Sequence, residues 1–209
     1  MKIRKYWPMS ELTVLQAVRL KGRVSEADLV ATLGEDAADV AATLAQLTAA
    51  GLVVEGKTFR ISPEGRERLN ALLAKERSGV DQNALAKTYG DFRVVNNEFK
   101  ALVSDWQIKH GQPNSHDDAE YDAAILNRLD NLHQQVLPIA ATITTLLPRL
   151  SGYAAKLNSA VDKVKAGDTT WFTRPIIDSY HTVWFELHEE LIGASGLSRE
   201  EEARAGHAD

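Results

Sequence analysis

Two short motifs in the second half of the chain place a histidine three residues after a carboxylate. They are Asp130 with His133 and Asp178 with His181. Residues three apart in a helix lie on the same face, so two such pairs on facing helices of a bundle could bind a metal ion. However, no bridging-glutamate pattern accompanies the pairs, and His188 lies too far along the helix from His181 to share one ion easily. We therefore interpret these histidines as residues at the edge of a helical core, each hydrogen-bonded to a carboxylate. We predict no metal site, cofactor or catalytic residue.

Aromatic and histidine side chains are concentrated between residues 171 and 189. Helical indexing places an apolar stripe on one side of this segment, with histidines flanking the stripe. A pocket with aromatic walls, a cation and imidazoles could hold an aromatic or anionic effector. The alternative is that the same rings pack into an ordinary aromatic core. The candidate effector-binding residues are Trp171, Arg174, His181, Trp184 and His188.

Another group of side chains, in the first part of the chain, could bind a polyanion. Cations cluster at the end of the first expected helix and occupy the tip and second strand of an expected hairpin, where they could neutralise phosphates. Two polar side chains on the third expected helix could read base edges in a major groove. The alternative is that the cations are ordinary solvated surface residues. The candidate DNA-binding residues are Arg19, Lys21, Arg23, Thr43, Gln46, Lys57 and Arg60, and Lys2, Arg4 and Lys5 could form a basic arm.

The elements that must position these cations follow from the apolar spacing and from the helix signals. Apolar residues at helical spacing predict helices over residues 10–21, 25–34 and 36–50, each followed or closed by glycine. The apolar runs 52–54 and 58–61 flank Glu55-Gly56-Lys57, which predicts a hairpin with a tight turn. Ser62 and Pro63 suit the cap and the first position of a further helix.

The stretch AGLVVEGKTFRISPEGRERL resembles the wing and following helix of MarR-like and PadR-like bacterial regulators. The resemblance covers residues 10–75 and implies a winged helix-turn-helix that binds duplex DNA as a dimer. The third helix departs from the pattern of those families, because it carries Asp36 and Asp39 in its first turn and has no lysine or arginine. Carboxylates at that end would repel phosphate, which puts sequence-specific reading in doubt.

The remaining residues predict helices only. An apolar stripe runs from Phe92 to Trp106, a loop covers residues 110–114, and a long helix should kink or break at Pro138. A last major helix is expected over residues 176–192. The segment DSYHTVWFELHEEL is similar to helical segments attached to phosphoenolpyruvate-utilising enzymes, which implies an accessory role beside such an enzyme.

Composition limits the classes of protein to which the chain can belong. It has 209 residues and no cysteine, which excludes disulfides and zinc–thiolate sites and fits a cytoplasmic protein. The first ten residues contain cations but no apolar segment, so we do not expect them to be a signal peptide, and no apolar run is long enough for a membrane span. Charge is uneven, because residues 1–80 carry 12 Lys and Arg against 10 Asp and Glu, whereas residues 81–209 carry 12 against 19. Only the first part could therefore approach a polyanion.

Together these features predict a mainly α protein. A winged helix-turn-helix over residues 1–78 is followed by an all-α helical-bundle domain over residues 79–209, which would dimerise the protein or bind an effector. We expect a DNA-binding transcriptional regulator, a homodimer, whose small-molecule effector is unknown. The alternative is a non-catalytic accessory or interaction protein whose winged helix does not bind DNA. No nucleophile, phosphate-loop or dinucleotide motif is present, so the chain is not expected to be an enzyme.

Overall fold

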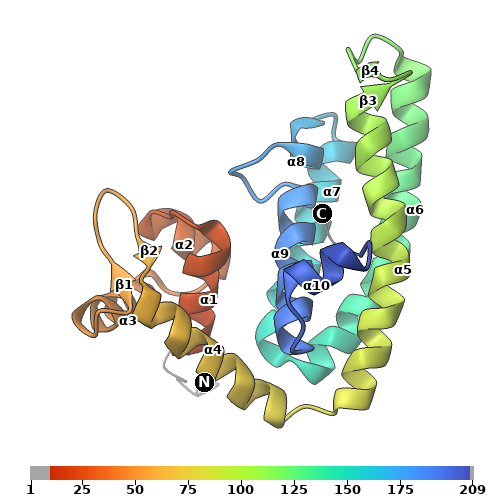
Figure 1. Ribbon diagram of the computed structural model, residues 1–209. Helices are drawn as coiled ribbons and strands as arrows, with labels where there is room; N and C mark the ends of the chain where they lie inside the picture. Colours follow the sequence, from red (N-terminus) through yellow and green to blue (C-terminus); the bar gives the residue numbers. More distant parts are fainter. Residues whose placement is uncertain (1–9, 208–209) are drawn as a thin grey trace, which may run out of the picture. The chain divides into compact units, whose positions relative to one another are not determined.

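The computed structural model describes residues 10–207, and within them the chain is mainly helical with two small antiparallel hairpins (Figure 1). The chain forms two compact units that divide between Gly79 and Val80, one residue after the expected boundary. Each unit has its own hydrophobic core. The basic arm expected at Lys2, Arg4 and Lys5 lies outside the described residues.

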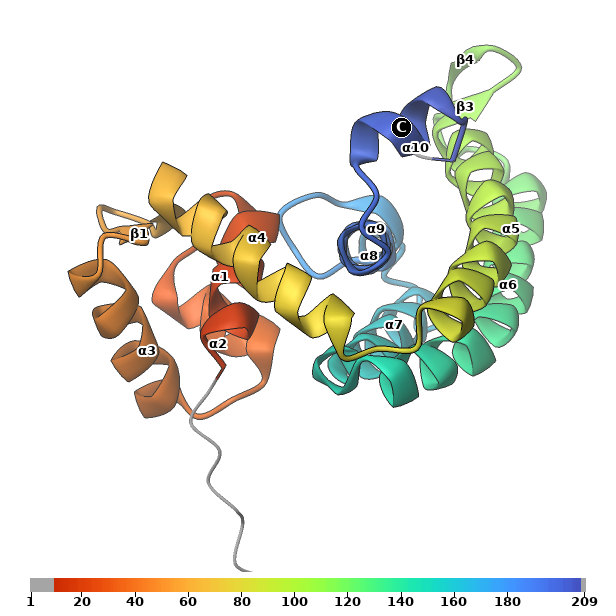
Figure 2. The ribbon, with the colours of Figure 1, turned by 60° about the horizontal axis from the view of Figure 1, so that its bottom comes forward.

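The first unit contains three helices, a hairpin and a fourth helix (Figure 2). Side chains fix the helix starts, because the hydroxyl of Ser25, the carboxylate of Asp36 and the hydroxyl of Ser62 each accept a backbone N–H of the first turn. Each helix presents an apolar face to one shared core. The elements are α1 (Glu11–Lys21), α2 (Glu26–Leu33), α3 (Ala37–Ala49), β1 (Val53–Val54), β2 (Arg60–Ile61) and α4 (Pro63–Ser78).

The hairpin is joined by a third extended segment that the sequence did not predict. Strand β1 pairs with β2 in the register Val53 to Ile61 and Val54 to Arg60. The segment between α1 and α2 then forms an antiparallel bridge from Val24 to Phe59. The two residues exchange backbone hydrogen bonds, with N–H···O distances of 3.1 and 2.8 Å. The loop after α1 is therefore tied to the hairpin.

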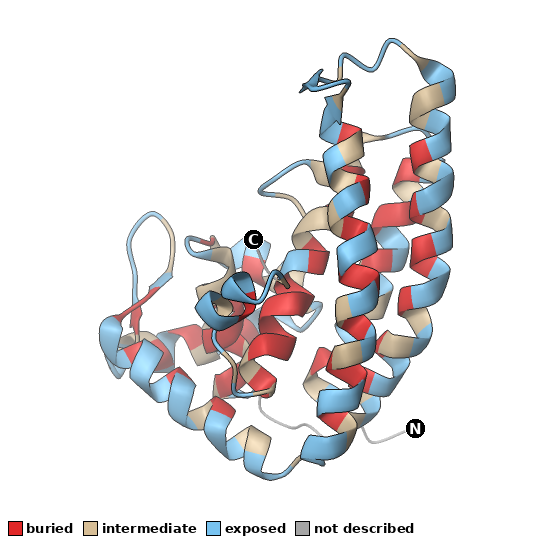
Figure 3. Cartoon of the chain, turned by 45° about the vertical axis from the view of Figure 1, so that its right-hand side comes forward, coloured by how far each residue is buried: buried red, intermediate tan, exposed pale blue. Residues whose placement is uncertain are grey.

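The second unit is built on two long helices that pack against each other along their length (Figures 1 and 2). Buried residues follow one face of these two helices and exposed residues follow the other (Figure 3). The elements are α5 (Gln82–Gln107), β3 (Ile108–Lys109), β4 (Gln112–Pro113), α6 (Ala119–Leu146), the 3-10 helix η1 (Pro148–Leu150), α7 (Gly152–Lys165), α8 (Thr170–Thr173), α9 (Tyr180–Ala194) and α10 (Arg199–Arg204).

Aromatic rings occupy the centre of this second core. Phe92 and Phe99 of α5 stack on Trp184 of α9, with ring centroids 5.1 and 4.4 Å apart. Tyr180 and Trp184 are almost completely buried. The aromatic stripe that the sequence places on α5 thus packs directly on the aromatic segment of α9.

Three expectations for the second unit were wrong in detail. The helix does not break at Pro138: α6 continues through this exposed proline, so the backbone carbonyl that loses its partner can be hydrated. Residues 108–113 form a small hairpin rather than only a loop, so the unit is not purely helical. The last long helix begins at Tyr180 rather than residue 176, because Ser179 is its N-cap and accepts the N–H of Thr182.

A membrane span is not found among the helices of residues 10–207, since none of them is both long and apolar enough.

Candidate functional site

The hairpin of the first unit presents exposed cations on one face. Arg23 and Arg60 lie beside the isolated antiparallel bridge between Val24 and Phe59, since Arg23 directly precedes Val24 and Arg60 directly follows Phe59. Their neighbours Val24 and Ile61 are buried, whereas Arg23 and Arg60 are exposed, so both arginines point outward. Lys57 is exposed in the loop between β1 and β2.

These three cations have no partner within the part of the chain that the structure describes. No ion pair or side-chain hydrogen bond joins Arg23, Lys57 or Arg60 to any of residues 10–207. The remaining predicted cations, Arg19 and Lys21, lie in the last turn of α1 and are partly buried. The Arg19 Nε donates to the side chain of Gln16 at 3.0 Å, so this guanidinium is already engaged within its helix.

The third helix contributes little to a base-reading surface. Thr43 is partly buried and its hydroxyl donates to the Asp39 carbonyl at 2.8 Å, within the helix. Gln46 is exposed and can reach a partner. The Asp36 side chain accepts the N–H of Ala38 at the helix start, where a carboxylate stabilises the helix dipole. The structure therefore places Arg23 and Arg60 beside the same backbone bridge, but α3 carries no cation.

The second unit contains a cavity of about 340 Å³ between α5, α9 and the start of α10. Three of the five predicted effector residues line it, namely His181, Trp184 and His188. Sequence reasoning missed the wall that α5 contributes, which includes Asn96, Phe99 and Lys100, and it missed Arg199. The only sequence feature that pointed to α5 was its stripe of aromatic residues. That stripe does not indicate that Asn96 and Lys100 also line the cavity.

The other two predicted effector residues lie elsewhere. Trp171 is partly buried and packs against the core, with the ammonium of Lys163 3.3 Å from the centre of its ring. Arg174 is exposed at the end of α8. Neither residue lines the cavity. The prediction included these two residues because they are close in sequence to the aromatic segment of α9. A loop separates them from α9, so they do not share its surroundings.

One wall of the cavity is supported by a buried polar network. The Tyr89 hydroxyl lies 3.0 Å from His188 Nε2 and donates to Glu202 Oε2 at 2.7 Å. Arg93 donates to both oxygens of the same carboxylate, with Nε at 2.9 Å from Oε2. Burial raises the pKa of the Tyr89 hydroxyl, as does its hydrogen bond to Glu202. Burial also opposes ionisation of Glu202, but the hydrogen bonds from Arg93 and Tyr89 outweigh it and lower the pKa of that carboxyl.

The Asp-x-x-His pairs do not converge. Asp130 forms an ion pair with Lys165, and Asp178 lies 3.6 Å from the ammonium of Lys156. His133 is buried, with Nε2 2.9 Å from the side-chain oxygen of Asn158. Among residues 10–207, no group of three or more histidine and acidic side chains is arranged to hold a metal ion.

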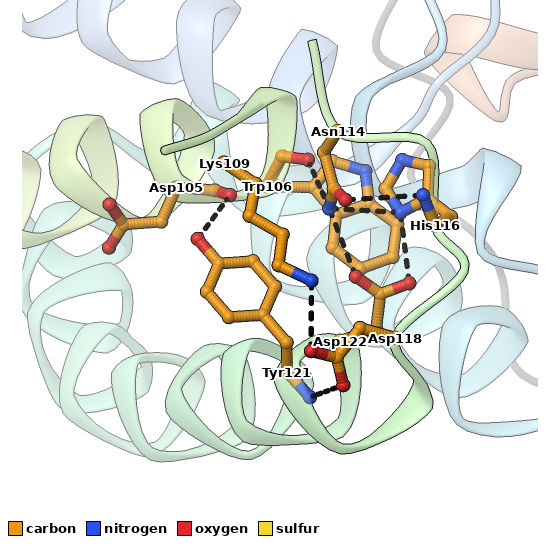
Figure 4. A network of polar contacts seen from close by, with 8 residues as sticks. All are labelled: Asp105, Trp106, Lys109, Asn114, His116, Asp118, Tyr121 and Asp122. Atoms are coloured by element: carbon orange, nitrogen blue, oxygen red, sulfur yellow. Dashed lines mark hydrogen bonds and ion pairs between the residues drawn. The ribbon is translucent and has the colours of Figure 1, made fainter. Parts of the chain in front are cut away.

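A second polar network lies where α5 ends and α6 begins (Figure 4). The His116 ring lies 4.3 Å from the Trp106 ring, and its Nδ1 is 2.9 Å from Asp122. The Asn114 amide donates to the Trp106 carbonyl at 3.1 Å and to Asp122 at 3.0 Å. These contacts join the residues after β4 to both helices, which is a structural role that sequence spacing did not reveal.

Comparison with known proteins gives no relative for this chain. No family model matches it, and neither a curated protein nor a solved structure matches it.

Proposed function

We propose that the first unit is a winged helix-turn-helix and that the protein is a cytoplasmic, homodimeric transcriptional regulator that binds duplex DNA. The second unit would serve dimerisation or effector sensing. The order of three helices, a hairpin and a closing helix supports this fold, as does the bridge from the loop after α1 to the hairpin. The bridge anchors the hairpin to the loop after α1, as a wing would require.

The observation that carries the proposal is that Arg23 and Arg60, both exposed, flank the bridge that ties the hairpin to the loop after α1. Two cations held near each other repel, and an anion that binds to both relieves this repulsion. A phosphate group suits such a pair, because guanidinium groups bind phosphate oxygens through two parallel hydrogen bonds. Lys57, in the hairpin loop, would contact a further phosphate.

The acidic start of α3 determines what kind of binding to expect. Asp36 and Asp39 would repel the backbone if that turn entered the groove, so most of the affinity must come from phosphate contacts at the wing. Binding should therefore depend strongly on salt. Sequence preference should be modest and depend on Gln46 and on the shape of the DNA.

The test is a titration of the full-length protein with a fluorescent 30-base-pair duplex of random sequence, followed by anisotropy at several salt concentrations. The R23A/R60A variant should bind at least about tenfold more weakly, and the slope of log affinity against log salt should become shallower by about two, since each lost phosphate contact removes about one unit. The K75A/K87A variant removes the same charge from exposed positions on α4 and α5, and it should retain wild-type binding.

Two outcomes would contradict the proposal. One is a wild-type protein that does not bind the duplex at low salt. The other is a K75A/K87A variant that loses as much affinity as R23A/R60A, which would mean that only net charge matters. When the wild-type protein binds, the sequences enriched among the bound duplexes show whether it prefers a particular operator.

The alternative is a non-catalytic accessory protein whose winged helix contacts another protein, such as a phosphoenolpyruvate-utilising enzyme. The specific observation in its favour is that α3 lacks a cation and starts with two aspartates. A surface of that kind suits a basic protein partner better than DNA. Failure of the duplex titration at low salt, with the protein folded, would favour this function.

A further inference from the structure

Helix α10 is held to the rest of the second unit by polar contacts. It has six residues, Arg199–Arg204, and of these only Glu202 is buried. No residue of α10 belongs to the hydrophobic core, whereas α5, α6, α7 and α9 each contribute an apolar face to it. A helix this short has little stability of its own, so α10 stays in place only while its polar contacts persist.

One face of α5 supplies most of these contacts. Tyr89, Arg93, Asn96 and Lys100 follow one another at spacings of four, three and four residues, which places them on the same side of the helix. All four donate hydrogen bonds to residues 202–207, and we call these four side chains the docking surface. A row of donors that includes two cations suits an acidic segment.

The first half of the docking surface binds a carboxylate. Glu202 accepts one hydrogen bond from the Tyr89 hydroxyl at 2.7 Å and two from Arg93, with Nε at 2.9 Å. Because the Tyr89 proton is used in that bond, the Tyr89 oxygen accepts from His188 Nε2, 3.0 Å away, and this contact orients the hydroxyl. A carboxylate bound by two nitrogens of one arginine belongs to the stronger class of hydrogen-bonded pairs.

The second half of the docking surface binds backbone carbonyls that follow α10. The Asn96 amide donates to the His207 carbonyl at 2.9 Å, and the Lys100 ammonium donates to the Gly206 carbonyl at 3.4 Å. Any peptide offers such carbonyls, whereas a carboxylate four or five residues before them is specific to the sequence. A glutamate about one turn before the end of a short helix is therefore the feature that this surface selects.

Helix α10 does not fill the space beside the docking surface. A cavity of about 340 Å³ remains between α5, α9 and Arg199, and Asn96 and Lys100 also line it. An unfilled space forfeits the van der Waals contacts that a close-packed helix would make. A helix with larger side chains at its start would make more contacts with the same surface, whereas α10 of a second copy would leave the same cavity.

We propose that the docking surface binds an acidic helix of another protein, with a glutamate about one turn before its end, and that α10 occupies the surface as an internal competitor. Charge complementarity supports this partner, because Arg93 and Lys100 are cationic and the present occupant carries three consecutive glutamates. The inference does not rest on DNA binding, since every residue that carries it belongs to the second unit.

Fluorescence anisotropy of a labelled peptide with the sequence of residues 195–207 tests the proposal. The full-length E202A variant lacks the carboxylate of the internal competitor. It should bind the peptide at least about tenfold more tightly than the wild type does, because the attached α10 of the wild type competes at a high effective concentration. E202Q keeps the size of the side chain and should shift the affinity in the same direction. Circular dichroism establishes that each variant is folded.

Matched peptides and variants locate the binding. A peptide with Glu202→Gln should bind E202A at least about tenfold more weakly, whereas one with Glu200→Gln, which loses the same charge at an exposed position, should bind as the parent does. R93A/E202A should bind the parent peptide about tenfold more weakly than E202A. R128A/E202A removes instead an exposed arginine of α6 that pairs with Asp105, and it should bind as E202A does.

The proposal is overturned if neither folded E202A nor folded E202Q binds the peptide at millimolar concentration. It is also overturned if the Glu202→Gln and Glu200→Gln peptides bind equally, or if the wild type binds as tightly as E202A. Analytical ultracentrifugation should give the same oligomeric state for the wild type and E202A. A dimer that becomes a monomer in E202A would identify a second copy as the occupant and overturn the proposal of a different protein. No DNA is present in these measurements, so failure of this inference and failure of the duplex titration are distinguishable.

Discussion

At the scale of single residues, His188 shows how burial and hydrogen bonding select one chemical form of a side chain. The residue is 5% exposed, and its Nε2 lies at the Tyr89 hydroxyl. The neighbouring charges act in both directions, since Arg199 and Arg93 disfavour the imidazolium while Glu189 and Glu202 favour it. Burial is the largest effect, and it keeps the ring neutral.

A neutral buried histidine makes stability depend on pH in a defined window. The pKa of His188 is lowered from 6.5 to about 4 in the folded protein, so between these values the unfolded chain binds one more proton than the folded chain. Stability should therefore rise as pH increases from about 4 to 6.5, by up to about 1.4 kcal/mol per pH unit, and should fall as pH decreases through the same range. H188Q keeps a donor at the position of Nε2 but cannot titrate. Urea unfolding from pH 4 to 7 should show a shallower pH dependence for H188Q, and an unchanged slope would contradict the assignment.

At the scale of elements, the first turn of α4 and the hairpin approach each other so closely that only glycine fits between them. A Cβ atom added at Gly65 would lie 2.0 Å from the Leu52 carbonyl oxygen and 2.9 Å from Ile61. Ser62 reinforces the same junction, since its hydroxyl accepts the Gly65 N–H at 2.9 Å and donates to the Gly51 carbonyl at 2.7 Å. The helix start and the hairpin are thus one structural unit.

The G65A variant should lower the stability of the first unit by about 3 kcal/mol, because a backbone clash cannot be relieved by a side-chain rotation. The matched control is G90A, in the interior of α5, where an added Cβ meets nothing within 4 Å. That variant should be unchanged or more stable by about 0.5–1 kcal/mol, because alanine loses less backbone entropy in a helix. Scanning calorimetry of the two full-length variants measures both effects. A G65A protein as stable as the wild type would disprove the close approach.

At the scale of the whole molecule, the chain has two cores that share no residue. Residues 80–207 bury an aromatic core of their own, and Glu202 of α10, which is 3% exposed, accepts a hydrogen bond from Tyr89 of that core. A segment of this length can bury enough surface to fold without its neighbour.

We therefore expect a fragment comprising residues 80–209 to unfold cooperatively and to retain the helical circular dichroism of that part of the chain. A fragment of residues 80–197 lacks α10 and leaves Arg93 and Tyr89 without the Glu202 carboxylate, so its midpoint of thermal unfolding should be lower. A non-cooperative melt of the longer fragment would show that the second unit depends on the first.

The sequence alone was sufficient for the helices and the hairpin of the first unit, because these depend on local signals. Apolar spacing identified the buried faces of α1, α3 and α5, and Ser62 with Pro63 marked the start of α4 within one residue. The helix break that the same signals allowed at Pro138 does not occur, since a solvent-facing proline lets a long helix continue when its other side is packed. The signals were wrong for residue 176, because the cap at Ser179, not the apolar spacing, starts α9.

The sites required the tertiary structure, since their residues come from segments far apart in the chain. Only the Val24–Phe59 bridge brings the segments that carry Arg23 and Arg60 side by side. His188 reaches Tyr89, 99 positions away, and Glu202 closes the network from α10. Residue types and periodicity could nominate His181, Trp184 and His188, but not the α5 wall that they face. Helix periodicity is a property of neighbouring residues, whereas the hydrogen-bond partner of a side chain is decided by how the helices pack.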